Sequence, residues 1–189
     1  MSAVTLARLV VPAMTVLALA SPAMAQCVAP ETVVKLEGSH PFVQTRTLKG
    51  VSRPLVSAGV VEAKGDAIVW RVTRPVEIVT KITPTGITQS VDGGPEEVMG
   101  GGAAGNPFFS ETGLLDLLKG DLTKVETRYE MKRTERKPAA GWKLDLKPKS
   151  AALAPYIASI AVEGCKRVEA VAVSQANGDV IRIELKDTP

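Results

Sequence analysis

Aromatic side chains are scarce in this sequence, and their scarcity excludes one class of function. Phe, Trp and Tyr together make up 4% of the residues, whereas hydrophobic residues make up 45%. Nucleic-acid binding is excluded, because the formal net charge is only +3 and few rings are available to stack on bases. Any buried region or bound molecule is therefore surrounded mainly by aliphatic side chains.

Catalytic and metal-binding patterns are also missing. One histidine, His40, and two cysteines, Cys27 and Cys165, are too few and too dispersed for a zinc site. No Gly-x-Ser-x-Gly motif or phosphate-binding glycine–lysine loop is present. The run GGGAAG at 100–105 matches Gly-x-Gly-x-x-Gly, but a dinucleotide site needs a strand before the loop and a helix opening directly from it. We therefore expect no enzyme, no metal and no cofactor.

Long hydrophobic runs are absent after the first 25 residues, and those residues have the pattern of a secretory signal peptide. Arg8 precedes the apolar run LVVPAMTVLALA at 9–20, and the triplet at 23–25 is Ala-Met-Ala. The run is shorter than the roughly 20 residues that a membrane span requires. We expect cleavage after Ala25, which leaves 26–189 as one exported domain.

Cys27 follows this cleavage site by two residues. Lipid attachment at Cys27 requires a small residue before it, and Gln26 argues against that use. In an oxidising compartment Cys165 is the only partner available for a disulfide, which we expect. Two unrelated thiols are the remaining alternative.

Most of the chain alternates apolar and polar residues, the pattern of half-buried strands. Lys64-Gly65-Asp66 and Asn177-Gly178-Asp179 have the chemistry of tight hairpin turns. The pattern predicts one curved antiparallel sheet or barrel. The expected strands are 42–49, 55–63, 67–73, 76–83, 87–91, 124–132, 142–147, 157–163, 168–174 and 179–186.

One apolar helix is predicted at 107–119. Asn106 suits the N-cap, Pro107 suits the first helical position, and Gly120 stands where the helix ends. Apolar residues cover more than half of its circumference, so the helix must be covered by the rest of the molecule. The residues expected to face the interior are Phe108, Leu115 and Leu118.

The order of these features resembles the LolA family of soluble periplasmic lipoprotein carriers. The segment PFVQTRTLKGVSRPLVSAGVVEAKGDAIVWRVTRP contains Phe42-x-Gln44, then Gly59, then Trp70. The segment NPFFSETGLLDLLKGDL is similar to the family's helix, and WKLDLKP, 142–148, is similar to a strand that follows it. The resemblance covers about 42–185 through order and spacing.

The resemblance implies a mainly β fold: an unclosed antiparallel β-barrel, or strongly curved sheet, with a lid or plug helix on its concave face. It implies a periplasmic monomer that shelters a lipoprotein or other acylated cargo between an inner-membrane export complex and an outer-membrane acceptor. Alternation gives eight further candidate residues for the lipid cavity, and for each of them ordinary core packing is the alternative interpretation. These are Trp70, Val72, Ile78, Ile82, Tyr129, Met131, Leu144 and Leu146.

The sequence departs from the family at two places. Lys64-Gly65 stands nearest to an Arg-Pro pair in which the arginine bonds to the lid, and a short PETVVKLEGS segment replaces a long first helix. Lysine lacks the planar fork of arginine. These departures concern the standard lipoprotein cargo more than the fold. Two alternative functions therefore stay open: a sensor of lipids or lipoproteins, and a carrier of a glycolipid or polyketide lipid.

Overall fold

The computed structural model describes residues 27–30, 36–83, 85–99, 116, 121–135, 141–151 and 153–186. The predicted signal peptide, the GGGAAG run and the lid residues Phe108, Leu115 and Leu118 lie outside these residues. No helix within the described ranges is both long enough and apolar enough to cross a membrane.

The described residues form one 11-stranded antiparallel sheet, as predicted. Its order is β6-β5-β4-β3-β2-β1-β11-β10-β9-β8-β7. The elements are β1 Gly38–Thr47, β2 Leu55–Lys64, β3 Ala67–Arg74, β4 Ile78–Thr83, β5 Gly86–Val91, β6 Glu97–Val98, α3 Leu122–Arg128, β7 Tyr129–Glu135, β8 Trp142–Pro148, β9 Ile157–Gly164, β10 Val168–Gln175 and β11 Val180–Leu185.

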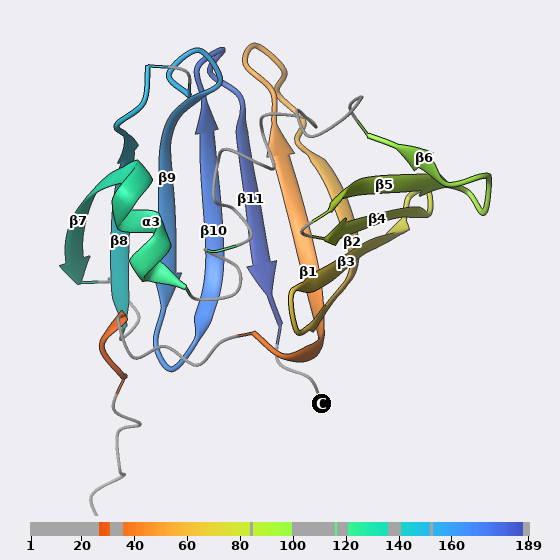
Figure 1. Cartoon of the computed structure of the whole chain (residues 1–189). Coiled ribbons are helices and arrows are strands. Elements are labelled where there is room, and N and C mark those ends of the chain that lie inside the picture. The colour runs from red at the N-terminus through yellow and green to blue at the C-terminus, as the bar shows by residue number, and fades with distance from the viewer. Residues whose placement is uncertain are drawn as a thin grey trace, which may run out of the picture.

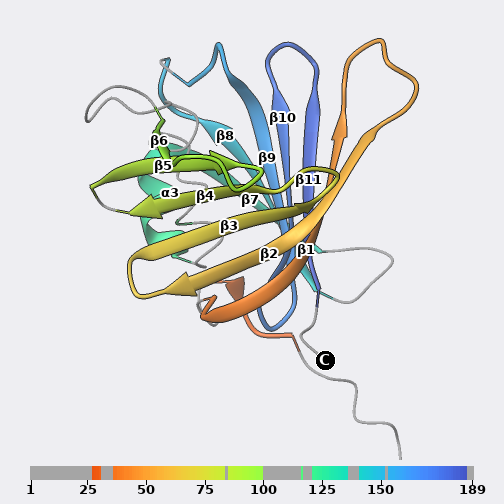
Figure 2. The ribbon, with the colours of Figure 1, turned by 90° about the vertical axis from the view of Figure 1, so that its right-hand side faces the viewer.

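The sheet consists of two meanders, β1–β6 and β7–β11, joined in its middle. The join is the antiparallel pairing of β1 with β11, from Phe42 opposite Leu185 to Thr47 opposite Val180. In Figure 1, β7–β11 and β1 stand side by side, while β3–β6 lie to the right of β1 and run crosswise to these upright strands. Figure 2 shows β3–β6 passing in front of β9–β11. Within the described chain the end strands β6 and β7 do not pair with each other, so the barrel is unclosed.

The helix α3 is a correction to the predicted strand at 124–132. Residues 122–128 are helical, and only from Tyr129 onward does the chain form a strand. Leu122, Val125 and Tyr129 are spaced by three and four residues, so a helix places all three on one side. Their burial against the sheet outweighs the period-two alternation of the same segment.

The Cys27–Cys165 disulfide is present, as predicted, with an S–S distance of 1.99 Å. It joins the start of the described chain to the turn between β9 and β10. The carbonyl oxygen of Cys165 accepts hydrogen bonds from the Val28 backbone N–H and the Trp142 Nε1–H, both at 3.1 Å. Gly164 permits this contact, because a Cβ there would lie 2.5 Å from Trp142 Cζ2.

Candidate functional site

The eight predicted cavity residues all lie on the concave face of the sheet. Residues directly opposite in antiparallel strands share a face. The register pairs Trp70 with Thr80, Val72 with Ile78 and Ile68 with Ile82. On the other meander it pairs Met131 with Leu146, and Leu144 with the core residue Val162.

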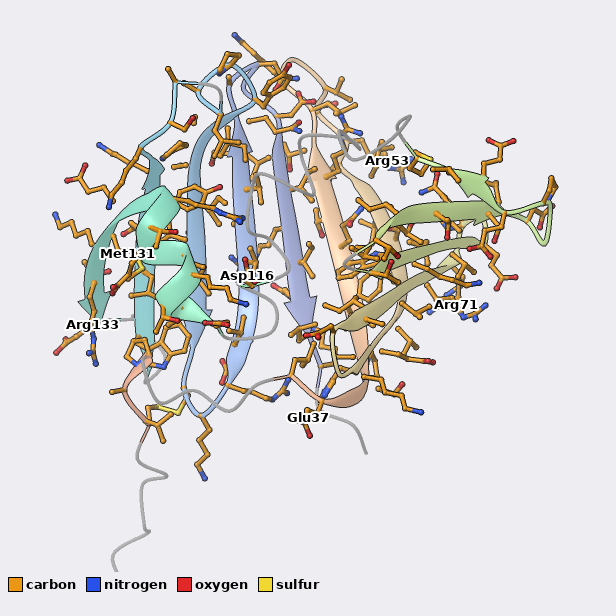
Figure 3. All side chains as sticks on the ribbon, viewed as in Figure 1. Glu37, Arg53, Arg71, Asp116, Met131 and Arg133 are labelled. Carbon is orange, nitrogen blue, oxygen red and sulfur yellow. A yellow bond between two sulfur atoms is a disulfide. The ribbon has the colours of Figure 1, made fainter. Side chains whose placement is uncertain are left out.

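One half of this face, over β7–β10, is covered; we call it the covered half. Tyr129, Leu144 and Leu146 are buried there beneath Leu122 and Val125 of α3. Figure 1 shows α3 lying across β8 on this face. These three predicted cavity residues are core residues in this structure, and Met131, labelled on β7 in Figure 3, packs at their edge.

The other half, over β3–β5, is the open half. Trp70, Val72 and Ile78 are only partly buried, and Val91, directly opposite Ile78, is 51% exposed. Ile82 at the far end of the same face is buried. An apolar surface therefore continues from the core into a region that water reaches.

Trp70 lies where the two halves meet. Its ring centroid is 4.1 Å from that of Phe42, with the planes tilted by 33°. It packs against both hydrophobic clusters, the one over β7–β10 and the one that contains Phe42, Val61 and Ile183. Trp70 therefore connects the buried side chains of the covered half with the partly buried side chains of the open half.

The polar groups of the concave face beside Trp70 are neutral, whereas the register also places two exposed cations on this face, Arg46 opposite Ile181 and Arg133 opposite Leu144. Gln89 Nε2 donates a hydrogen bond to the buried Thr80 Oγ1 at 3.0 Å in the open half. In the covered half, burial raises the pKa of the Tyr129 phenol to about 12 because its anion is poorly solvated there. The part of the concavity around Trp70 thus suits an uncharged, apolar guest.

Charged groups gather on the opposite, convex face. Arg182 Nη2 lies 3.1 Å from Glu163 Oε2, and its Nε lies 3.1 Å from Glu184 Oε1. These groups border a surface hollow of about 330 Å³ that is also lined by Arg167 and Lys186. A lining of this charge is unsuited to an acyl chain, because each exposed ion keeps its water.

His40 and the possible metal ligands offer no catalytic constellation in the described residues. His40 lies within β1, two residues after the strand begins, and its Nε2 is 2.8 Å from the Glu37 carbonyl oxygen. Its Nδ1 is buried without a hydrogen-bond partner. Across the described ranges, no three His, Cys, Asp or Glu side chains cluster as metal ligands would.

Neither a family model nor a curated protein matches the chain. The solved structures that are similar to it include the following three. A DUF1329 family protein from Desulfovibrio piger is 10% identical, with a TM-score of 0.42 over 79% of this chain and 83% of that one. A putative outer membrane lipoprotein-sorting protein domain from Vibrio parahaemolyticus is 12% identical, with a TM-score of 0.39 over 79% and 84%.

The third structure, from Nitrosomonas europaea, is 9% identical, with a TM-score of 0.44 over 84% of this chain and 88% of that one. At these identities and TM-scores, the function of this chain has to be inferred from its own residues. The Nitrosomonas europaea protein is described as a member of the LolA superfamily, the group that this sequence resembles in the order of its motifs.

Proposed function

We propose that this protein is a soluble carrier that shelters an acyl chain in the concavity of its sheet. The observation that supports the proposal is that one half of a continuous apolar face is buried, whereas the other half is only partly buried. The covered half is packed as a core, whereas Trp70, Val72 and Ile78 in the open half are only partly buried. The covered half gives the fold its stability, and the open half is left for a guest.

The energetics of such a carrier favour exchange with a membrane. Burial of an acyl chain of about 16 carbons is worth on the order of 12 kcal/mol, at roughly 0.8 kcal/mol per CH₂. A chain that leaves a bilayer loses the same amount, so the protein needs only to match the membrane approximately. Uptake and release are then both accessible.

The class of cargo and the compartment are part of the same proposal. We propose that residues 1–25 are removed, that 26–189 form one domain, and that it acts in the periplasm on a lipoprotein or similar acylated cargo. The disulfide supports this compartment, because such bonds persist in oxidising surroundings. An inner-membrane exporter and an outer-membrane acceptor would be its partners.

Tryptophan fluorescence tests the acyl site. The chain has two tryptophans, Trp70 at the junction with the open half and Trp142, which is 2% exposed in the covered half. Brominated acyl chains quench an indole on contact. We expect a brominated lipid to quench Trp142→Phe, which retains Trp70, and to leave Trp70→Phe, which retains Trp142, almost unchanged. Equal quenching of both variants, or none in either, would contradict the proposal.

A matched pair of substitutions on β3 separates binding from folding. Val72 faces the concavity, whereas Val69 pairs with Glu62 and Lys81 on the convex face. We expect Val72→Asp to abolish lipid retention and Val69→Asp to preserve it. Circular dichroism checks that both variants keep the sheet. The native mass of the protein from its own periplasm then tells a lipoprotein cargo from a free lipid.

A further inference from the structure

The hairpin between β1 and β2 projects beyond the strands on either side. β2 pairs with β1 from Leu55 onward but with β3 only from Ala58 onward. On the other flank, the pairing of β1 with β11 ends at Thr47. Residues 48–57 therefore extend past both neighbours, and Figure 2 shows this orange hairpin standing clear of β3.

Apolar side chains are concentrated on this projection. Val51, Leu55 and Val56 are 47%, 58% and 60% exposed. They are three of the seven large hydrophobic side chains that are exposed in the described residues. Packing in the hydrophobic core does not account for these side chains, because about half of the surface of each is exposed to water.

The same hairpin is basic. Neither Asp nor Glu occurs between Glu37 and Glu62. Within the described chain, neither the Lys49 side chain nor the Arg53 side chain forms an ion pair with a carboxylate. Arg46, lower on β1, is already bound to Asp179 at 3.3 Å.

The surface continues from the hairpin onto the neighbouring loops. The Lys49 side chain lies against Gly178 of the β10–β11 turn, within 2.8 Å of the position where a Cβ would stand. Ala176, two residues before Gly178, donates its backbone N–H to the carbonyl oxygen of Tyr156. Tyr156 is 54% exposed. The Nζ of Lys149, in the loop that contains Tyr156, donates a hydrogen bond to the Glu126 carbonyl oxygen at 2.8 Å.

We propose that Lys49, Val51, Arg53, Leu55 and Val56, here called the hairpin patch, dock the protein on a bilayer that contains anionic phospholipid. The apolar side chains enter the boundary between headgroups and acyl chains, while the two cations bind lipid phosphates. Long basic side chains suit this position because their stems lie in apolar surroundings and their charges reach the headgroups. This surface lies outside the acyl site and is independent of it.

Co-sedimentation of the full chain with vesicles tests the proposal. The vesicles contain phosphatidylcholine alone, or phosphatidylcholine with phosphatidylglycerol. We expect binding only to the second kind and weaker binding at high salt. The double variant Lys49→Gln, Arg53→Gln should lower the partition coefficient about 25-fold, at about fivefold for each cation. The double variant Leu55→Ser, Val56→Ser should lower it at least about tenfold.

Two matched controls lie elsewhere. Lys166→Gln removes an exposed cation from the turn at the opposite end of β9 and β10, and Val98→Ser removes a valine that is 70% exposed on β6. Both should bind vesicles as the parent protein does. Equal binding to both kinds of vesicle, or an equal loss in the controls, would overturn the proposal.

The same experiment distinguishes a protein partner from a lipid surface. A parent protein that ignores vesicles, while its hairpin variants fail only with native membranes, would show that the patch binds a protein and would refute membrane docking. Quenching of Trp70 by brominated lipid in detergent-free solution reports the acyl site separately. Hairpin variants that keep this quenching, yet lose the vesicles, would support docking as an independent function.

Discussion

Removal of the Cys27–Cys165 disulfide should lower the free energy of unfolding by about 2–5 kcal/mol. The cross-link spans 138 residues, and loop closure of that length is worth about 5 kcal/mol in the chain-entropy relation. The full value is reached only if residues 27–30 stay docked after reduction. Their anchors are the hydrogen bond from the Val28 N–H to Cys165 and the packing of Val28 on the covered half. Fraying of these residues would bring the loss toward about 2 kcal/mol.

The assay is urea unfolding of the Cys27→Ala, Cys165→Ala double variant, compared with the parent protein with and without reductant. The double variant and the reduced parent should coincide, which separates the cross-link from the packing of the new side chains. The dependence of the unfolding free energy on urea should steepen without the cross-link, because the unfolded chain becomes more expanded. A loss below about 1 kcal/mol with an unchanged slope would refute this reasoning.

Three further predictions concern single residues. Gly59→Ala should destabilise the protein by about 1–3 kcal/mol or more in the same urea assay, because its Cβ would stand 1.9 Å from the Arg71 carbonyl oxygen. Gly38→Ala meets no atom within 4 Å, so it should cost only the backbone strain of an alanine at a φ of +80°, about 1–2 kcal/mol. The Lys49 backbone N–H, together with Arg46, holds the pKa of Asp179 below its usual 3.8. The Asp179 carboxylate therefore contributes stability above pH 3.8, and this contribution is lost as the pH falls through the lowered pKa. We expect Asp179→Asn to make the free energy of unfolding less dependent on pH in the acid range. Burial raises the pKa of Tyr129 from 10 to about 12, so the contribution of Tyr129 to stability is present below pH 10 and is lost between pH 10 and 12. In the variant Tyr156→Phe, Tyr129 is the remaining tyrosine, and its ionisation can be followed by tyrosinate absorbance. Absorbance that appeared near pH 10 without unfolding would contradict the burial of Tyr129.

Most of the strands were predictable from sequence because each carries its own alternation, whereas the two-residue strand β6 is too short to show one and was not predicted. Trp142, Leu144 and Leu146 face inward and Lys143, Asp145 and Lys147 face outward, as period two requires. Gly59, one of the residues that carry the family resemblance, has a local reason as well, since β2 approaches β3 too closely there for a side chain. Such local constraints are visible in single segments.

The helix α3 was missed because its sequence satisfies two periods at once. Val125, Thr127 and Tyr129 alternate as a strand does, but Leu122, Val125 and Tyr129 also follow helical spacing. Asp121 directly before Leu122 was the available signal for a helix start. The alternation of apolar and polar residues continues without a break from α3 into β7, so the sequence does not show where helical spacing gives way to strand spacing.

The division of the concave face into two halves was not predictable. Trp70 and Leu144 alternate in the same way along their strands, yet only Leu144 is fully buried. The difference arises from what packs above them, α3 and the turn that contains Leu153, which are distant in sequence from β3. The hairpin patch was missed for a related reason, because exposure of Leu55 depends on where β3 ends.

The central pairing of β1 with β11 also determines when the molecule can be completed. β11 is synthesised after every other strand of the sheet, and its partner residues in β1 lie about 140 positions earlier, as Phe42 and Leu185 do. Until β11 is available, the two meanders share no strand pairing, so the joining step is late and slow by the usual dependence of folding rate on contact separation. Loss of β11 would therefore leave two separate sheets with four unpaired edge strands, whereas loss of an end strand such as β6 would leave one sheet.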